Sequence, residues 1–227
     1  MQGNDQQAYD RGTSLFSPDG RIYQVEYARE AVKRGGASVG VRTADGIVFA
    51  AQARARSELM EAGSIEKLHK FDEHVGGASA GHVADARKLI DFARQRAQVN
   101  RLRFEEPVGV ETLAKEITDH IQESTQIGGT RPYGAALLIG GVDPDGAPRL
   151  FETDPSGTPH EWAATAIGGG NEGIRSYLED HYEDELDIEA GIDLALSAIQ
   201  REEERTADEV SLATITAEEG YRVYSLE

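Results

Sequence analysis

The stretch YDRGTSLFSPDGRIYQVEYAREAVKRG, residues 9–35, decides which fold is expected of this chain. Residues 17–20 read Ser-Pro-Asp-Gly, a turn in which proline fixes φ at the second position and glycine closes the fourth. Beyond the turn, apolar residues recur at steps of three and four: Ile22, Val25, Ala28 and Val32. This spacing predicts an amphipathic helix over residues 22–33.

The same stretch closely resembles the N-terminal signature of proteasome α-subunits. The matching segments are Tyr-Asp-Arg at 9–11, Phe-Ser-Pro-Asp-Gly-Arg at 16–21 and Gln-Val-Glu-Tyr-Ala at 24–28. The resemblance continues at 64–67, 83–87, 128–134 and 148–157. It covers nearly the whole chain and is thinnest after Gly173.

The rest of the chain alternates strand-like runs with pairs of helical patterns. Strands are expected at 37–43, 47–51, 67–71, 75–80, 135–142, 149–153, 160–167, 210–216 and 221–224, and helical faces at 83–97, 110–121, 174–181 and 192–199. Tight turns join neighbouring strands, which makes them antiparallel and the class α+β. The resemblance implies a four-layer α-β-β-α sandwich of two antiparallel sheets, the N-terminal-nucleophile hydrolase fold, with an extra N-terminal helix.

One domain is expected over residues 17–227, because no linker, repeat or low-complexity tract interrupts them. Residues 1–16 are polar and have no period, which predicts a mobile terminus. Neither a run of about 18 apolar residues nor a basic-then-apolar leader occurs, so no membrane span or secretory signal is expected. These features fit a cytoplasmic protein.

The composition is strongly acidic, with 41 Asp and Glu against 23 Lys and Arg and a net charge of −18. Such a field repels nucleic acid and anionic membranes. Only five of the cations are lysine. Acid excess with scarce lysine indicates a cytoplasm rich in salt and hence a salt-loving organism, and an ordinary acidic protein is the alternative.

Two segments match the G-x-S-x-G pattern of serine hydrolases, around Ser38 and Ser79. Only Ser79 falls between a strand and a helix, as that chemistry requires, and Asp143 or Asp154 followed by His160 would complete the order. A self-contained serine hydrolase using Ser79 is therefore the alternative function. The hairpins speak against it, because the hydrolase fold needs parallel strands.

Other patterns that suggest a ligand are weaker. Gly168, Gly170 and Gly173 match the G-x-G-x-x-G of nucleotide-binding turns, but a second helix follows instead of a parallel strand, and Glu172 adds negative charge there. The chain has no cysteine, and its six histidines form no zinc pattern. No metal or other cofactor is expected.

The resemblance also implies that the chain has no peptidase activity of its own. Proteasome β-subunits use an N-terminal threonine as nucleophile, with its own amine as base. Here Gly-Ala-Ser at 36–38 stands where a catalytic subunit would show threonines, and Gln52 replaces the expected acid. The chain is therefore expected to be a noncatalytic subunit, with activity residing in β-subunits.

What the resemblance implies instead is assembly and gating. In the family, α-subunits form heptameric outer rings that scaffold β-rings, admit unfolded protein through an axial pore and dock an ATP-driven unfoldase ring. Tyr9, Asp10, Pro18 and Tyr27 would form the cluster that holds the gate open, and Arg11 completes the tripeptide motif.

Two further sites follow from the resemblance. The unfoldase would insert its C-terminal tails into a pocket containing Gly35 and Lys67, because a C-terminal carboxylate needs a cation and N–H donors. His82 lies where family members often carry leucine, which makes this pocket more polar. A loop narrowing the pore, called the pore loop below, would consist of Gln126, Ile127, Gly128, Gly129 and Thr130.

Overall fold

The computed structural model describes residues 16–53, 59–60, 64–127, 129–200 and 210–224. The helices are α2 (Tyr23–Lys33), α3 (Val83–Phe104), α4 (Val110–Gln126), α5 (Asn171–His181) and α6 (Ile188–Gln200). The strands are β1 (Ser38–Arg42), β2 (Gly46–Gln52), β3 (Leu68–Asp72), β4 (Val75–Gly81), β5 (Ala135–Val142), β6 (Pro148–Thr153), β7 (Pro159–Glu161), β8 (Ala164–Ile167), β9 (Val210–Thr216) and β10 (Gly220–Tyr224).

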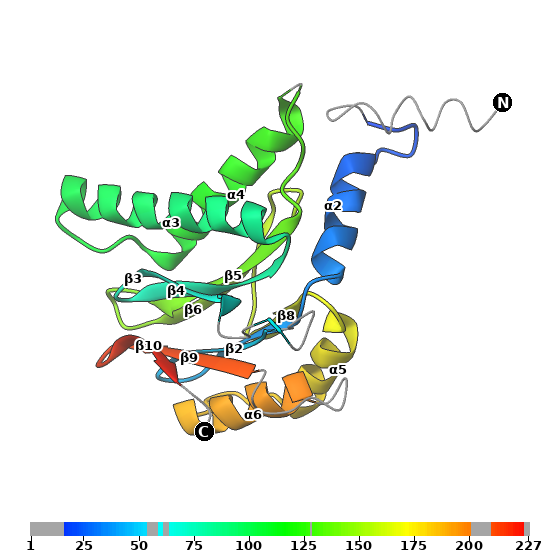
Figure 1. The fold of residues 1–227 in the computed structure, drawn as a ribbon. Coiled ribbons are helices and arrows are strands. Elements are labelled where there is room, and N and C mark those ends of the chain that lie inside the picture. Colours follow the sequence, from blue (N-terminus) through cyan, green and yellow to red (C-terminus); the bar gives the residue numbers. More distant parts are fainter. Residues whose placement is uncertain (1–15, 54–58, 61–63, 128, 201–209, 225–227) are drawn as a thin grey trace.

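The strands form two five-stranded sheets, in the orders β10-β9-β2-β1-β8 and β3-β4-β5-β6-β7. Every pairing within them is antiparallel. Figure 1 shows the sheets stacked face to face, with α3 and α4 covering one outer face and α5 and α6 the other. The expected four-layer α-β-β-α sandwich is confirmed.

Each interface between layers has its own apolar core. The cluster under α3 and α4 includes Leu113, Ile117 and Ile139. The cluster between the sheets is centred on residues such as Phe49 and Leu150, and a third lies between β1, β2 and the pair α5–α6. Because each sheet buries both faces, central strands such as β2 (GIVFAAQ) and β5 (AALLIGGV) are buried along their whole length and read as nearly continuous apolar runs.

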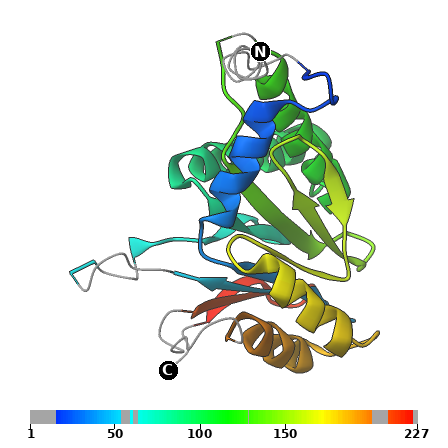
Figure 2. The same cartoon turned by 90° about the vertical axis from the view of Figure 1, so that its right-hand side faces the viewer.

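The helix expected over 22–33 is present as α2, which begins one residue later because Ile22 is its N-cap, in an extended conformation. Val25, Ala28 and Val32 form its buried stripe, as the spacing predicted. Figures 1 and 2 show α2 standing at one side of the sandwich, with its N-terminal end projecting beyond the sheets.

The prediction of a single strand over residues 160–167 is wrong. The chain pairs with β6 as β7, then crosses to the other sheet and pairs with β1 as β8. The crossing is held by two backbone hydrogen bonds, from Trp162 N to Leu150 O (2.9 Å) and from Arg42 N to Ala163 O (2.8 Å). Composition does not reveal the switch, because both halves read as strand.

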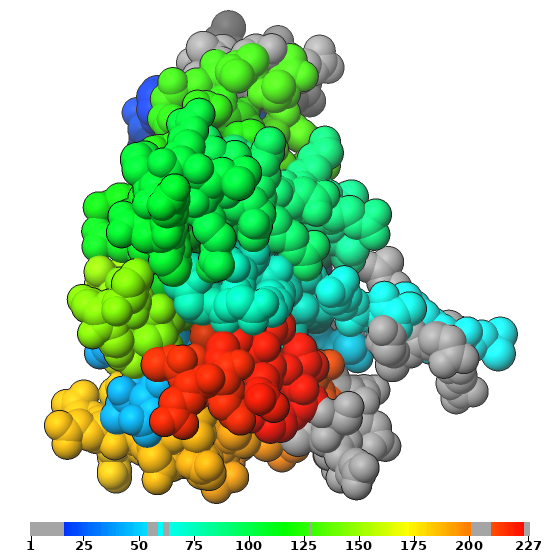
Figure 3. Space-filling view, turned by 90° about the vertical axis from the view of Figure 1, so that its left-hand side faces the viewer, coloured from blue at the N-terminus to red at the C-terminus, as the bar shows by residue number. Residues whose placement is uncertain are grey.

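The hairpin β9–β10 lies between the helical layers on the face shown in Figure 3. Its backbone reaches the opposite sheet, since Tyr221 N donates to Glu73 O at 2.8 Å. Of the helices that the structure describes, none combines the length and apolar character that crossing a bilayer requires.

Candidate functional site

Three glycines pack together where α2 ends: Gly35 follows α2, Gly81 ends β4, and Gly134 precedes β5. A Cβ added to Gly35 would lie 2.5 Å from the nitrogen of Gly81, and one added to Gly81 would lie 2.4 Å from the carbonyl oxygen of Gly134. Gly81 also has φ +104°, which side chains rarely adopt. The close approach of α2 to the ends of β4 and β5 therefore depends on glycine.

Lys67 reaches the same place from the residue before β3. Its Nζ donates to Gly36 O at 2.6 Å and to Ala37 O at 3.1 Å. The ammonium is thereby held against the link between α2 and β1. We call this place the α2 junction, made of Gly35, Gly36, Ala37, Lys67, Gly81 and His82. The structure thus brings together all three residues expected in the activator pocket.

His82 follows β4 and is the N-cap of α3. Its backbone N–H donates to Gly134 O at 2.8 Å, and its exposed imidazole has Nδ1 3.8 Å from Asp85 Oδ1. A histidine at this position is therefore compatible with the fold and places a polar ring at the rim of the junction.

Asp85, in the first turn of α3, forms a two-pronged ion pair with Arg131. The Nη1–Oδ2 and Nη2–Oδ1 distances are 2.6 and 2.8 Å, and Gly134 N donates to Oδ2 at 2.9 Å. Burial by itself would raise the pKa of this carboxyl, but the hydrogen bonds from Arg131 and Gly134 outweigh it and lower the pKa. Asp85 is thus ionised near neutral pH.

The pore loop follows directly from α4. Gln126 ends the helix, Ile127 is its extended C-cap, and Gly129 has φ +88°. Thr130 Oγ1 donates to Ile127 O at 2.7 Å and to Ser124 O at 2.9 Å. Gly128 lies outside the described residues. The described part of the loop is therefore a tight turn at the end of α4.

Of the expected gate residues, Tyr9, Asp10 and Arg11 lie outside the described residues. Pro18, in the turn before α2, is exposed, and Tyr27 on α2 is 49% exposed. Figures 1 and 2 show the start of α2 and the end of α4 projecting from the same end of the molecule.

An ion pair that the sequence did not suggest also holds α2. Arg29 contacts Asp154 through Nη2 at 2.7 Å and through Nε at 2.8 Å, and its Nη1 contacts Glu26 at 2.8 Å. The sequence suggested Asp154 only as a hydrolase residue. The spacing of 125 residues between Arg29 and Asp154 leaves no local signal for such a pair.

The position on β1 where an N-terminal nucleophile would stand is buried and inaccessible. Ser38 is fully buried, pairs with Ala51 on β2, and donates from Oγ to Ser79 O at 2.9 Å. Gln52 is buried as well, and its backbone N–H donates to Ala37 O at 2.9 Å. A peptide bond cannot reach a side chain in this position without unpacking the two sheets.

Ser79 does not lie on a strand-to-helix turn. It is a buried residue within the antiparallel strand β4, and its Oγ lies 3.1 Å from Nε2 of His69 on β3. Asp154 pairs with Arg29 instead, and His160 is an exposed residue of β7. The geometry therefore gives no support to a serine hydrolase using Ser79 with these partners.

The buried His69 leads us to expect that the free energy of unfolding of this chain depends on pH. Its side chain is 7% exposed, and burial, together with the charges of Arg94 and Lys67, lowers its pKa from 6.5 to about 4. The unfolded chain therefore binds a proton that the folded chain does not, and stability falls as pH drops from about 6.5 to about 4. The loss amounts to about 3 kcal/mol in the free energy of unfolding.

Urea unfolding of the isolated chain at several pH values checks this expectation. Carboxylates titrate over part of the same range, so the comparison is with His69→Gln, which should lose distinctly less stability on acidification. His160→Gln, at an exposed position, should behave like the unchanged chain. Equal acid sensitivity of His69→Gln and the parent would contradict the assignment.

The glycine pattern at 168–173 forms the turn from β8 into α5, with Gly170 as the N-cap at φ +70°. Lys33 lies beside it, its Nζ 3.6 Å from Glu172 Oε1. These residues line a hollow of 370 Å³. Glu172 in the first turn of α5 pairs with Lys33, the cation that a phosphate would need. Packing explains the glycine at the start of the turn, because a Cβ on Gly168 would lie 2.4 Å from Gly36 O.

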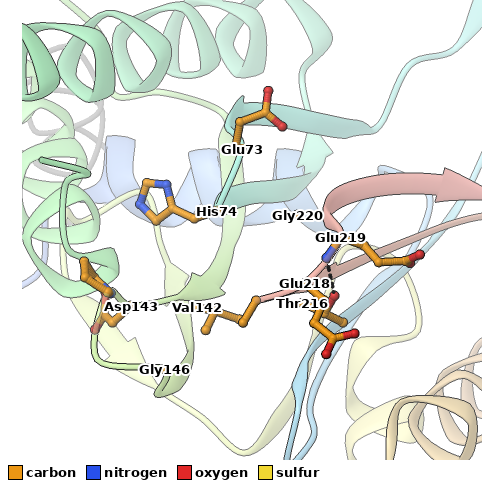
Figure 4. Close-up of a pocket in the computed structure, with 11 residues that line it drawn as sticks. Glu73, His74, Val142, Asp143, Gly146, Thr216, Glu218, Glu219 and Gly220 are labelled. Carbon is orange, nitrogen blue, oxygen red and sulfur yellow. Dashed lines mark hydrogen bonds between the residues drawn. The ribbon is translucent and has the colours of Figure 1, made fainter.

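A second hollow, of 430 Å³, lies between the turns of three hairpins (Figure 4). Acidic side chains surround it: Glu73, Asp143, Glu218 and Glu219. Strand β4 runs from this hollow, near Val75, to the α2 junction at Gly81, so the two lie at opposite ends of the sheet. Among the described residues, no group of three or more acidic or histidine side chains is placed to hold a metal.

A family model described as "Proteasome subunit" matches residues 32–215, and a second model, for the N-terminal signature of A-type proteasome subunits, matches residues 9–31. The second match ends within α2, and the first covers nearly all of the sandwich.

The chain is 63% identical to proteasome subunit alpha 1 of Haloarcula marismortui, over 96% of this chain and 85% of the relative. It is 64% identical to proteasome subunit alpha 2 of Haloferax volcanii, over 100% and 91%. It is 60% identical to proteasome subunit alpha of Halobacterium salinarum, over 97% and 88%. These haloarchaeal relatives agree with the acid-rich composition. With both family models matched in chain order and such relatives aligned along nearly its full length, the chain belongs to the proteasome α-subunit family.

Proposed function

We propose that this chain is a noncatalytic subunit that gates the proteasome core and docks its activator. The observation that supports the noncatalytic role is the closed position on β1. An N-terminal nucleophile needs a free α-amine beside an accessible hydroxyl. Ser38 is internal to the chain, has α2 before it, and donates its hydroxyl to Ser79 O.

The ring is formed by repetition of one head-to-tail contact through a closing rotation. Helix α2 suits such a contact, because it stands at the side of the sandwich and carries large exposed side chains, with Tyr27 at 49% and the preceding Phe16 at 69% exposure. Proteasome β-subunits stack on this ring. Seven copies close the ring, as membership of the family implies.

Gating is assigned to the terminus before α2, whose residues Tyr9, Asp10 and Arg11 would act with Pro18 and Tyr27. The placement of the pore loop at the same end of the molecule supports one shared channel. The segment has two states, ordered when an activator is bound and lying across the pore when it is not. Unfolded protein chains are the substrates that pass.

The α2 junction receives the activator. A C-terminal carboxylate is captured by a cation and backbone N–H groups, and Lys67 supplies a cation fixed by two carbonyl oxygens. The partner is an ATP-driven unfoldase ring with exposed C-terminal tails. His82 at the rim adjusts which tail residues fit.

Reconstitution tests the proposal. The purified chain alone should form rings by native mass spectrometry and hydrolyse no fluorogenic peptide. Added proteasome β-subunits should produce a four-ring cylinder that does hydrolyse it. A stable monomer that cuts peptides unaided would contradict both the scaffold role and the absence of a nucleophile.

A further inference from the structure

Asp85 lies between the two functional regions proposed above. It is three residues beyond His82 of the α2 junction, and its partner Arg131 directly follows Thr130 of the pore loop. The carboxylate side chain is 7% exposed and receives both prongs of the guanidinium, at 2.6 and 2.8 Å. A buried carboxylate held in this way strongly resists separation from its partner.

The same carboxylate is joined to the junction through backbone groups. Gly134 N donates to Asp85 Oδ2 at 2.9 Å, while Gly134 O accepts from His82 N at 2.8 Å. Gly134 O also lies where a Cβ on Gly81 would approach it to 2.4 Å, and Gly81 touches Gly35 in the same manner. Because these backbone atoms are already in close contact, we expect a displacement of Gly35 or Gly81 to be passed on to Gly134 and Asp85.

On the other side, Arg131 ties the pore loop to α3. The hydroxyl of Thr130 bonds to Ile127 O and Ser124 O, which are contacts within the loop and the end of α4. The guanidinium instead reaches across 46 residues of sequence to the start of α3. The residue that directly follows the pore loop is thus tied to Asp85 at the start of α3.

We propose that Asp85 and Arg131 form a latch that transmits occupancy of the α2 junction to the pore loop. Both are positioning residues, since neither belongs to the α2 junction or to the pore loop and each acts through the other. The inference rests on the proposed function, because it needs a tail bound at the junction. It adds that the pore loop itself responds to docking, in addition to the terminal gate.

The chain offers a matched control for the latch. Asp72 is also 7% exposed and pairs with a half-exposed arginine, Arg101, at 2.8 Å. This pair joins β3 to the far part of α3, away from the junction and the pore loop. Arg131→Gln and Arg101→Gln therefore each leave one buried aspartate without its arginine, and only Arg131→Gln breaks the proposed path.

The absence of cysteine makes a direct readout possible, because Ile127→Cys creates a unique labelling position in the exposed pore loop. A spin label there is read in the assembled α–β cylinder. The probe is a synthetic peptide that copies the C-terminal tail of the unfoldase, with its C-terminal amide as the uncharged control. Peptide affinity is measured on the same samples by fluorescence anisotropy.

With the latch intact, the carboxylate peptide should change the label's line shape and stimulate hydrolysis of a fluorogenic peptide. In Arg131→Gln, the line-shape change should vanish and stimulation should fall about two- to thirtyfold, the range by which mutations along a coupling network change the coupling. Arg101→Gln should behave as the parent does. Arg131→Lys, which keeps the charge, should restore part of the response. Each Gln variant leaves one buried aspartate without its arginine, so thermal unfolding of the Arg131→Gln cylinder that matches that of Arg101→Gln excludes misfolding as the cause.

The outcomes separate the two proposals. If the peptide binds the parent but leaves the label unchanged, or if Arg131→Gln responds like Arg101→Gln, the latch is refuted and the docking pocket stands. If the peptide fails to bind the parent cylinder, the pocket is refuted, and the latch with it.

Discussion

Replacing Lys67 by alanine is expected to abolish degradation stimulated by the unfoldase while leaving ring assembly intact. The change removes the cation that Gly36 O and Ala37 O hold at the α2 junction. A hydrogen bond to a charged group stabilises by about 1.5–3 kcal/mol, so each tail should bind about ten- to 150-fold more weakly. Several tails dock at once, and the loss multiplies across them.

ATP-dependent degradation of an unfolded protein, set beside native mass spectrometry of the cylinder, measures this effect. Lys70→Ala is the matched control, since Lys70 lies three residues further along and its ammonium pairs with Glu73 at 2.6 Å. It should retain stimulation. If Lys67→Ala is stimulated as strongly as Lys70→Ala, Lys67 has no part in the pocket.

Gly81→Ala is expected to destabilise the chain by more than about 3 kcal/mol, or to prevent folding. Two costs combine at this position. A side chain at φ +104° strains the backbone, at about 1–3 kcal/mol. The new methyl would also lie 2.4 Å from Gly134 O, a backbone atom that cannot rotate away, and overpacking of this kind costs about 1–3 kcal/mol more.

Gly146→Ala separates the two costs. Gly146 has φ +88°, but a Cβ there would meet nothing within 4 Å, so only the backbone strain applies. Urea unfolding should show a loss of about 1–2 kcal/mol for Gly146→Ala and a clearly larger one for Gly81→Ala, with the m-value unchanged. Equal losses would mean that the packing at the α2 junction is looser than described.

Much of the fold follows from local patterns. The turn at 17–20 and the spacing of Val25, Ala28 and Val32 predicted α2, because one helical face must be apolar to pack. The turn at 143–146 predicted the antiparallel pair β5–β6. Such signals involve residues that are close in sequence, and that is why they can be read without a structure.

The site was predictable only in part. The resemblance pointed to Gly35, Lys67 and His82, which the fold brings to one junction. It gave no role to Asp85 or Arg131, although both lie in the matching segments, since a motif records identity and not pairing. The partner of Ser79 was likewise missed, because His69 faces it only through the register of β3 and β4.

By itself, the sequence determined the α+β class, the amphipathic N-terminal helix and the acidic composition, all of which depend on residue type and short spacing. Only the tertiary structure decided that residues 160–167 divide between two sheets, that Ser38 is sealed in the core, and that Asp85 meets Arg131. These outcomes depend on which distant segments the packing of four layers brings into contact. That is a property of the whole chain, and no local stretch carries it.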